Sequence, residues 1–446
     1  MSNEKLAILG GTPLIDESVD FIPLFKWPII TKEDEDAALE VIRAGKFSAT
    51  DISMKLEEEF AQWIGTKHAL TFCNGTQALA AAMFAIGLGA GDEIICTTKT
   101  YWASITPALI FGATPVFCNI DENLSMDVED IERCITSKTK AIMAVHYCAY
   151  PCNMDRIMEI AKKHNLIVIE DVSHAQGGRY KGKRLGTFGH IAAMSMMSEK
   201  SLAVGECGML CTDDTKLYQR AMAYGHYERN NEKFIQDNAE LEPFFGLPLG
   251  GVKARLNQVS AAIGRVQLKH YDERCAEIDK AMNYFWDLVE EIPGLRAIRP
   301  EKGSGSTMGG WYACKGIFDP EAFHGLSAMK FCEAVRAEMR NKAATWAGAN
   351  FCLHTHNLFK KFDFRNAGKP STIEYMDAAE YYGDKACEKS LIDNSFSAPW
   401  FKHFNKNAIE LIAACFKKVA ENHMQLVEVG NDEKTQGGRW FGTKDE

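Results

Sequence analysis

The sequence predicts an α/β fold with a mostly parallel, doubly wound sheet. The first observation behind this prediction is that strand-like and helix-like segments alternate regularly from about residue 68 to residue 171. The second is that LIVIED, which ends at Asp171, has the apolar pattern of a buried strand. The third is the length of 446 residues, which is enough for one large domain with an extensive core and a smaller second domain.

The predicted elements follow in order along the chain. Helical patterns cover residues 32–43 and 54–63, HALTF predicts a strand over 68–72, and NGTQALAAAMFAIG predicts a helix from near Thr76. GDEIICTT, TPVFCNID, AIMAVHYCA and LIVIED predict four further strands, with helices predicted at YWASITPALIFG and MDRIMEIAKKHN. The glycines of GLGAG follow a helix and precede a strand, so we interpret them as a helix end rather than a phosphate-binding loop.

A change of pattern predicts the domain boundary. A long helical pattern from residue 256 to about residue 292 is followed by IPGLRAIRPEKGSGSTMGG, which is rich in Pro, Gly and Ser. We therefore predict a large domain over 1–292, a smaller α+β domain over 293–430 and a polar tail over 431–446.

Composition narrows the classes of partner and compartment. The net charge of −10 argues against a nucleic-acid-binding surface, which needs clustered Lys and Arg. The 14 cysteines are scattered without CxxC pairs, which favours free thiols in a reducing, cytoplasmic environment. Because no apolar run approaches the ~18 residues of a membrane span, we expect no membrane partner.

Two groups after predicted strands could bind a charged ligand. Asn74, Gly75 and Thr76 form a strand-to-helix turn, where free amides and a hydroxyl suit a phosphate, although such a turn by itself is more typical of a helix cap. Asp171 ends LIVIED, at the edge of a parallel sheet where ligands bind, and its carboxylate could hold a protonated nitrogen.

Two further groups add a nucleophile and an aromatic surface. Lys200 follows the apolar run IAAMSMM, and a desolvated lysine is a nucleophile toward a carbonyl. Tyr101 and Trp102 follow GDEIICTT, where an aromatic ring could cover a planar ligand. Each feature alone has an ordinary structural explanation, but together they form the set that pyridoxal phosphate requires.

These motifs resemble the DegT-type (StrS-like) sugar aminotransferases, which are fold-type I pyridoxal phosphate enzymes. The resemblance covers about residues 5–430 and is densest in FCNGTQALAAAMFAIGLGAGDEII, in VIEDVSHAQGGRYKGKRLGTFGH and in GVKARLNQVSAAIGRVQL. It implies a large domain with a mostly parallel seven-stranded-type sheet between helices, plus a smaller C-terminal α+β domain. The predicted class is therefore a pyridoxal phosphate-dependent aminotransferase.

The resemblance also implies roles for individual residues. Lys200 matches the lysine that forms a Schiff base with the cofactor, and Asp171 matches the partner of the pyridine nitrogen. Gly75, Thr76 and Ser195 match positions that contact the cofactor phosphate.

Three more positions complete the predicted site. Tyr101 matches the aromatic that stacks on the cofactor ring, and His174 takes a place near the ring oxygen. Lys253, in GVKARL, replaces an asparagine that reaches the cofactor phosphate of a neighbouring subunit. This correspondence implies a homodimer with shared active sites, and we predict no metal ion.

Three hypotheses for the function follow. The first is transfer of an amino group from glutamine or glutamate to the ketone of a cyclitol, such as scyllo-inosose, or of a sugar; Lys253 favours the cyclitol. The second is a nucleotide-linked keto-sugar as acceptor. The third is a non-catalytic homologue that binds the cofactor, which only the unusual residues Glu199 and Cys207 favour.

Several histidines and cysteines have weaker claims to a role. Cys352, His354 and His356 in CLHTH could form a metal cluster, but with no obvious fourth ligand they are expected to line the substrate pocket. His146 and His226 are candidates for substrate contacts and equally for structural roles.

Overall fold

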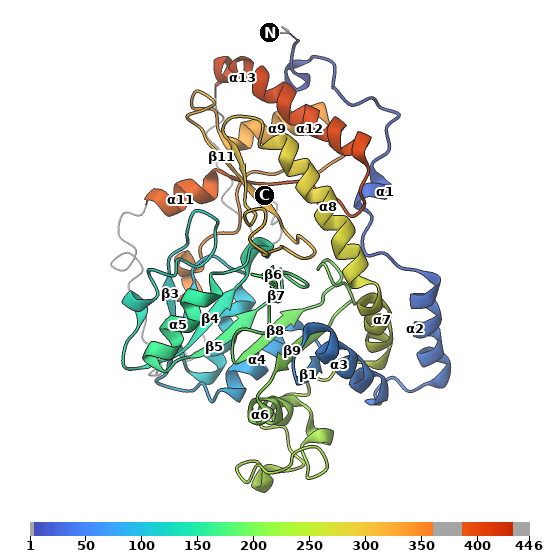
Figure 1. The fold of residues 1–446 in the computed structure, drawn as a ribbon, viewed down its shortest axis with the longest axis vertical. Coiled ribbons are helices and arrows are strands. Elements are labelled where there is room, and N and C mark those ends of the chain that lie inside the picture. The colour runs from blue at the N-terminus through green and yellow to red at the C-terminus, as the bar shows by residue number, and fades with distance from the viewer. Residues whose placement is uncertain (1–3, 360–385, 431–446) are drawn as a thin grey trace.

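The chain folds around a seven-stranded sheet, shown in Figure 1. The computed structural model describes residues 4–359 and 386–430. The strands lie in the order β1-β9-β8-β5-β4-β2-β3. Their bounds are β1 His68–Phe72, β2 Glu93–Thr97, β3 Thr114–Cys118, β4 Thr139–Val145, β5 Ile167–Asp171, β8 Ile191–Ser195 and β9 Gly208–Thr212.

The direction of the strands gathers the site at one edge of this sheet. β9 is antiparallel to its neighbours β1 and β8, and all other pairs are parallel. Six strands therefore present their carboxyl ends at the same edge, where β9 begins. Ligands of open α/β sheets bind at this edge.

Helices cover both faces of the large sheet. α4 and α6 pack together on one face, while α3 and α5 lie against the other. The helices that surround the sheet are α2 Lys32–Ala44, α3 Asp51–Ile64, α4 Gly75–Ala85, α5 Met154–His164, α6 Thr215–Gly225 and α7 Gln258–Lys269. No helix within the described ranges is long and apolar enough to cross a membrane.

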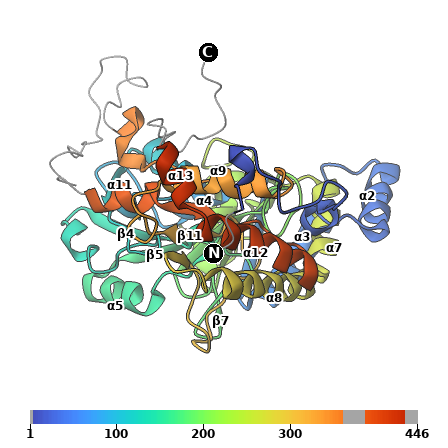
Figure 2. The ribbon, with the colours of Figure 1, turned by 90° about the horizontal axis from the view of Figure 1, so that it is seen from above.

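A second, smaller sheet lies at the other end of α8 (Figures 1 and 2). It is antiparallel, in the order β10-β11-β12. Its strands and the helices near it are β10 Leu295–Ala297, β11 Lys315–Phe318, β12 Ser395–Ser397, α8 Tyr271–Val289, α9 Ala328–Glu338, α11 Ala386–Asp393, α12 Lys406–Glu421 and α13 Met424–Val429. One hydrophobic cluster runs from residues of α3 and β8 through α8 to α9 and α12.

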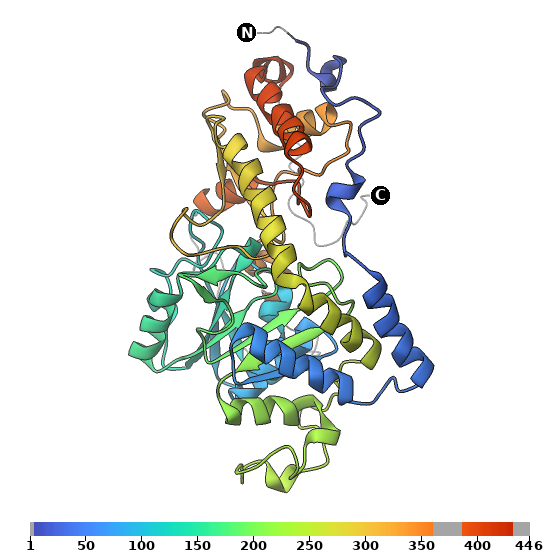
Figure 3. The same cartoon turned by 45° about the vertical axis from the view of Figure 1, so that its right-hand side comes forward.

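The N-terminal segment runs along the outside of the molecule. Figure 3 shows it descending from the helices around the small sheet to α2, through the short helix α1 (Ile22–Phe25). Near the small sheet, the amide of Ala7 donates to Glu338 of α9 at 2.8 Å. Near the large sheet, the Gln267 amide group of α7 donates to the carbonyl of Ile29 at 3.1 Å.

The predicted elements match the structure at most positions. HALTF is β1, and the helix expected from near Thr76 begins at Gly75. One prediction is wrong, because YWASITPALIFG forms two 3-10 helices, Trp102–Ser104 and Thr106–Phe111, rather than an α-helix. Ile105 separates them, and Pro107, which has no N–H to donate, is the second residue of the second helix. The domain boundary near residue 292 stays a prediction, and the tail over 431–446 lies outside the described residues.

A buried ion pair holds β1 in its place in the sheet. Glu57 of α3 accepts hydrogen bonds from the backbone N–H and the hydroxyl of Thr71, at 2.9 and 2.7 Å. The guanidinium of Arg229 lies 2.9 Å from the same carboxylate, and both charged side chains are almost fully buried. Because β1 leads into the turn at Asn74, this network fixes where that turn begins.

We expect Glu57→Ala to destabilise the fold by about 3–5 kcal/mol, since it leaves the Arg229 charge buried without its partner. Urea unfolding followed by circular dichroism measures this change. Glu58→Ala, which removes an exposed neighbour on the same helix, is the control and should cost less than about 0.5 kcal/mol. Equal losses in the two variants would contradict the role given to the buried pair.

Candidate active site

The turn after β1 presents amide groups to a negative ligand. Asn74 caps α4 by accepting a hydrogen bond from the Gln77 amide at 2.9 Å. The amides of Gly75 and Thr76 lie in the first turn of the helix, where they have no intrahelical acceptor. Because the helix dipole also places partial positive charge here, this turn favours an anion.

Two glycines allow this turn to lie directly on the sheet. A β-carbon at Gly75 would lie 2.5 Å from the β-carbon of Ser195, and one at Gly208 would lie 2.2 Å from the Asn74 carbonyl oxygen. The register Phe72↔Gly208 and Ser195↔Gly208 places these positions in one row across β1, β9 and β8. The structure thus brings Gly75 against Ser195, as their predicted common role requires.

Asp171 is held as a buried carboxylate at the end of β5. Its side chain accepts a hydrogen bond from the Ser104 hydroxyl at 2.6 Å through one oxygen and from the Ser173 amide at 3.0 Å through the other. The residue is only 4% exposed. Sequence reasoning missed Ser104, which lies in the segment wrongly expected to be an α-helix.

Lys200 lies in the loop between β8 and β9 rather than at the end of a strand. Its ammonium lies 4.1 Å from the centre of the Tyr312 ring, and the residue is buried. Burial lowers the pKa of Lys200 to about 8, although the negative charges of Asp171 and Glu199 oppose the shift. At neutral pH this amine therefore gives up its proton far more readily than an ordinary lysine.

His174 lies between two aromatic rings beside Lys200. Its ring centroid is 5.4 Å from that of Tyr147 and 4.8 Å from that of Tyr312. Burial, and then the charge of Lys200, hold the pKa of His174 well below the usual value. The amide of Cys148 donates to Nδ1 at 3.3 Å, so a neutral His174 carries its proton on Nε2 and can donate from there.

Tyr312 is a residue of this site that sequence reasoning did not find. It follows the glycine-rich stretch between α8 and β11, so a segment next to the small sheet contributes to the surroundings of Lys200. The aromatic residue at the end of GSGSTMGGWY was the available signal.

Two other predicted residues, Tyr101 and Lys253, are less buried than Lys200. Tyr101 is half-buried, and burial raises its pKa. Lys253 is exposed, with its ammonium 5.4 Å from the Tyr227 ring centre. The carbonyl of the next residue, Ala254, accepts a hydrogen bond from the Cys73 amide at 2.8 Å. The loop of Lys253 is therefore bonded to the residue that precedes the turn at Asn74.

Both histidines considered for substrate contacts have structural partners. His146 is fully buried, accepts from the Cys152 amide at 3.1 Å and lies 3.1 Å from Glu170. His226 is also buried and lies 2.8 Å from the carbonyl of Thr71. Both rings thus support neighbouring strands, and a contact of either ring with substrate stays a prediction.

The CLHTH segment packs against the large sheet. His354 hydrogen-bonds the Thr98 hydroxyl, and the Leu353 amide donates to the Thr98 carbonyl at 2.8 Å. Cys352 is buried, and His356 stacks on Phe351. Among the residues that the structure describes, no group of three or more potential metal ligands occurs.

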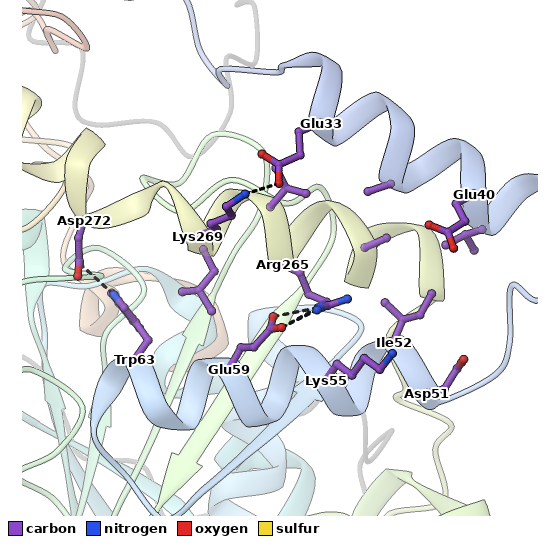
Figure 4. A pocket seen from close by; sticks show the side chains of 15 residues that line it. Glu33, Glu40, Asp51, Ile52, Lys55, Glu59, Trp63, Arg265, Lys269 and Asp272 are labelled. Atoms are coloured by element: carbon purple, nitrogen blue, oxygen red, sulfur yellow. Dashed lines mark hydrogen bonds and ion pairs between the residues drawn. The ribbon is translucent and has the colours of Figure 1, made fainter.

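A separate groove of about 650 Å³ lies between α2, α3 and α7. Figure 4 shows its charged side chains, including the ion pairs Glu59–Arg265 and Lys269–Glu33. Its walls contain none of the residues predicted for the cofactor. The groove is thus distinct from the site at the sheet edge.

The residues at the sheet edge fit pyridoxal phosphate. The Gly75 turn, which a single β-carbon would fill, offers amides for a phosphate. Asp171 offers a buried carboxylate for a protonated ring nitrogen, and Lys200 offers an amine with a lowered pKa for an aldehyde.

Comparison with known proteins identifies the family. The DegT/DnrJ/EryC1/StrS aminotransferase family matches residues 28–366. The chain belongs to this family. Its members are pyridoxal phosphate-dependent aminotransferases, so the predicted enzyme class, cofactor and fold type are confirmed.

Individual relatives within the family carry different substrate names. GDP-perosamine synthase of Escherichia coli O157:H7 is 38% identical over 256 residues, which cover 57% of this chain and 67% of the relative. A Micromonospora echinospora protein, provisionally named L-glutamine:3-amino-2,3-dideoxy-scyllo-inosose aminotransferase, is 31% identical over 340 residues, covering 75% and 78%. The X-ray structure of the aminotransferase from Psychrobacter cryohalolentis is 27% identical, with a TM-score of 0.77, over 90% of this chain and 100% of that one.

We expect Gly75→Ala to weaken pyridoxal phosphate binding at least about 10-fold, because the added methyl group cannot fit against Ser195. Titration of the cofactor-free protein, followed by visible absorbance, measures the change in Kd. Gly89→Ala is the matched control, because nothing lies within 4 Å of a β-carbon there. Unchanged affinity in Gly75→Ala would contradict the role of the Gly75 turn in binding the cofactor phosphate.

The lowered pKa of Lys200 predicts how its reactivity depends on pH. In the cofactor-free protein, the rate of reductive methylation at Lys200 should rise with a midpoint near pH 8. Asp171→Asn should move this midpoint to lower pH, since the Asp171 carboxylate raises the pKa of the amine. Mass spectrometry of the labelled peptide measures both values, and a midpoint near the ordinary value of about 10.4 would contradict the burial argument.

Proposed function

We propose that this aminotransferase moves an amino group from glutamine or glutamate to the ketone of a cyclitol of the scyllo-inosose type. The single observation that carries the reaction is the buried amine of Lys200, within electrostatic reach of the Asp171 carboxylate. The cyclitol acceptor is supported by Lys253 and by the scyllo-inosose name of a relative that aligns over 75% of this chain. The donor is supported by the glutamine in the name of that relative.

Lys200 and Asp171 divide the proton chemistry between them. Bound pyridoxal phosphate supplies a carbonyl for the amino group and a ring that accepts the electron pair of the donor's α-carbon. The uncharged Nζ of Lys200 takes the proton from the α-carbon of the donor. When the amino group later passes to the acceptor, Lys200 gives a proton to the acceptor carbon that receives it. Asp171, fixed by Ser104 and Ser173, keeps a proton on the ring nitrogen.

The other predicted residues bind the cofactor and orient its ring. We assign the phosphate to Gly75, Thr76 and Ser195, and the ring face to Tyr101. His174 donates from Nε2 toward the ring oxygen, which fits its neutral state and the Cys148 amide on Nδ1.

We assign Lys253 to a second subunit's phosphate. This role is supported by its exposure in its own chain and by the tie between its loop and the turn after β1. The active protein is then a homodimer with shared sites.

A second candidate acceptor is a nucleotide-linked keto-sugar. The observation in its favour is the 38% identity to a GDP-perosamine synthase. Both acceptors require the same chemistry at Lys200, so they differ only in what the pocket beyond it must hold.

The non-catalytic alternative has little support. Cys207 is buried against Met196 in the core, and Glu199 is exposed beside Lys200 without displacing it. Neither residue removes the amine or the carboxylate.

We expect Lys200→Ala to lower turnover at least about 10³-fold, because no other group takes over proton transfer at the α-carbon. A glutamate- and glutamine-coupled assay measures the loss. Lys253→Ala should weaken phosphate binding while leaving Lys200 in place. If sites are shared, each mixed dimer of the two variants has one complete site out of two, so it should reach about half of the wild-type activity at a cofactor concentration too low to load Lys253→Ala alone. Full transamination by Lys200→Ala would overturn the mechanism.

The acceptor is tested by direct comparison of scyllo-inosose with a nucleotide-linked keto-sugar in the same assay. We expect kcat/KM for the cyclitol to be higher by at least about 10-fold, corresponding to about 1.4 kcal/mol in transition-state binding. A preference of that size for the nucleotide-linked sugar would support the second candidate instead.

A further inference from the structure

The carbonyl oxygen of Lys200 is bonded to a side chain from the N-terminal segment. The indole N–H of Trp27 donates to this oxygen at 2.9 Å. The Lys200 amide, in turn, donates to Met197 at 2.8 Å within its own loop. Both backbone polar groups of Lys200 are thus hydrogen-bonded, one locally and one to a residue far away in the sequence.

We propose that Trp27 is a positioning residue for Lys200, acting through this hydrogen bond. The inference rests on the proposed role of Lys200 and goes beyond it, because no feature of the sequence motifs connects the two residues. It explains why a distant, irregular segment matters to the amine at the sheet edge.

Trp27 is itself held in place on both sides. The Lys402 amide donates to the carbonyl of Leu24 at 2.8 Å, and Gln267 donates to the carbonyl of Ile29 at 3.1 Å. Phe25 packs against Phe401, with ring centres 5.4 Å apart. The indole therefore presents its N–H from a segment that is already ordered, which makes a single hydrogen bond effective for positioning.

A row of three aromatic rings leads from Trp27 to the Lys200 amine. The rings of Trp27 and Trp400 lie 5.9 Å apart, and those of Trp400 and Tyr312 lie 5.5 Å apart. Trp400 donates to the carbonyl of Gly310 at 2.9 Å, and Tyr312 lies against the Lys200 ammonium. Three separate segments thus converge on one lysine.

The loop of Lys200 depends on such support. Between β8 and β9 it is closed by a backbone bond from Val204 to Met196, at 2.9 Å, and by the bridge between Met197 and Gly205. A shift of the backbone at Lys200 would carry the side chain with it, and small misplacements of a reacting group cost large factors in rate. The Trp27 bond opposes such a shift because it anchors the Lys200 carbonyl oxygen.

The test is Trp27→Phe, which keeps an aromatic ring and removes only the donor. We expect kcat to fall about 10-fold, with KM for either substrate within about 2-fold, because the effect falls on the reacting amine. The matched control is Trp63→Phe, which loses an indole hydrogen bond of the same 2.9 Å length to Asp272 outside the site. That variant should keep kcat within about 2-fold.

A second readout does not depend on turnover. In the cofactor-free protein, the midpoint of Lys200 methylation should rise in Trp27→Phe, because a loosened loop exposes the amine to water. Trp63→Phe should leave the midpoint unchanged. Trp27→His, which restores a ring N–H, should recover part of both effects, and it is also the variant to use if Trp27→Phe does not fold.

The outcomes separate this inference from the proposed function. If Trp27→Phe and Trp63→Phe agree in kcat and in the methylation midpoint, the positioning role is overturned while the role of Lys200 stands. If Lys200→Ala keeps its turnover, the proposed function fails whatever the tryptophan variants show.

Discussion

The close approach between the first turn of α4 and the ends of β8 and β9 sets the geometry of the whole site. It exists because two positions, Gly75 and Gly208, carry no β-carbon, so backbone lies directly on backbone. This contact brings the amides of the turn to the side of the sheet where Asp171 and Ser195 lie. A β-carbon at either position would force this turn away from the sheet.

Burial then gives the assembled groups their chemistry. Lys200 is kept reactive by the cost of holding a charge away from water, and the nearby carboxylates moderate that effect without cancelling it. His174 is kept neutral by the same cost and receives a fixed proton position from the Cys148 amide. Glu170 and His146 support these groups from the interior of the sheet. They hydrogen-bond each other, and Glu170 also accepts from the Gly189 amide in the loop before β8.

The sequence predicted the parts of the site that lie in continuous motifs, but not those brought in by tertiary packing. Strand ends follow from apolar runs, which is why Asp171 and the turn at Gly75 were foreseen. β9 was missed, because GMLCT is short and its antiparallel place between β1 and β8 has no local signature. Ser104, Tyr312 and Trp27 were missed for a related reason, since each reaches the site from a segment whose own pattern indicates nothing about catalysis.

The hydrophobic cluster that joins both sheets has a consequence for how substrates enter. Because α8 contributes Ile278, Phe285 and Trp286 to one uninterrupted interior with α3 and α12, the small sheet cannot swing away as a rigid unit without exposing that interior to water. Opening of the molecule along a hinge between the two sheets is therefore costly, and movement of side chains at the rim is the less costly way to admit donor and acceptor.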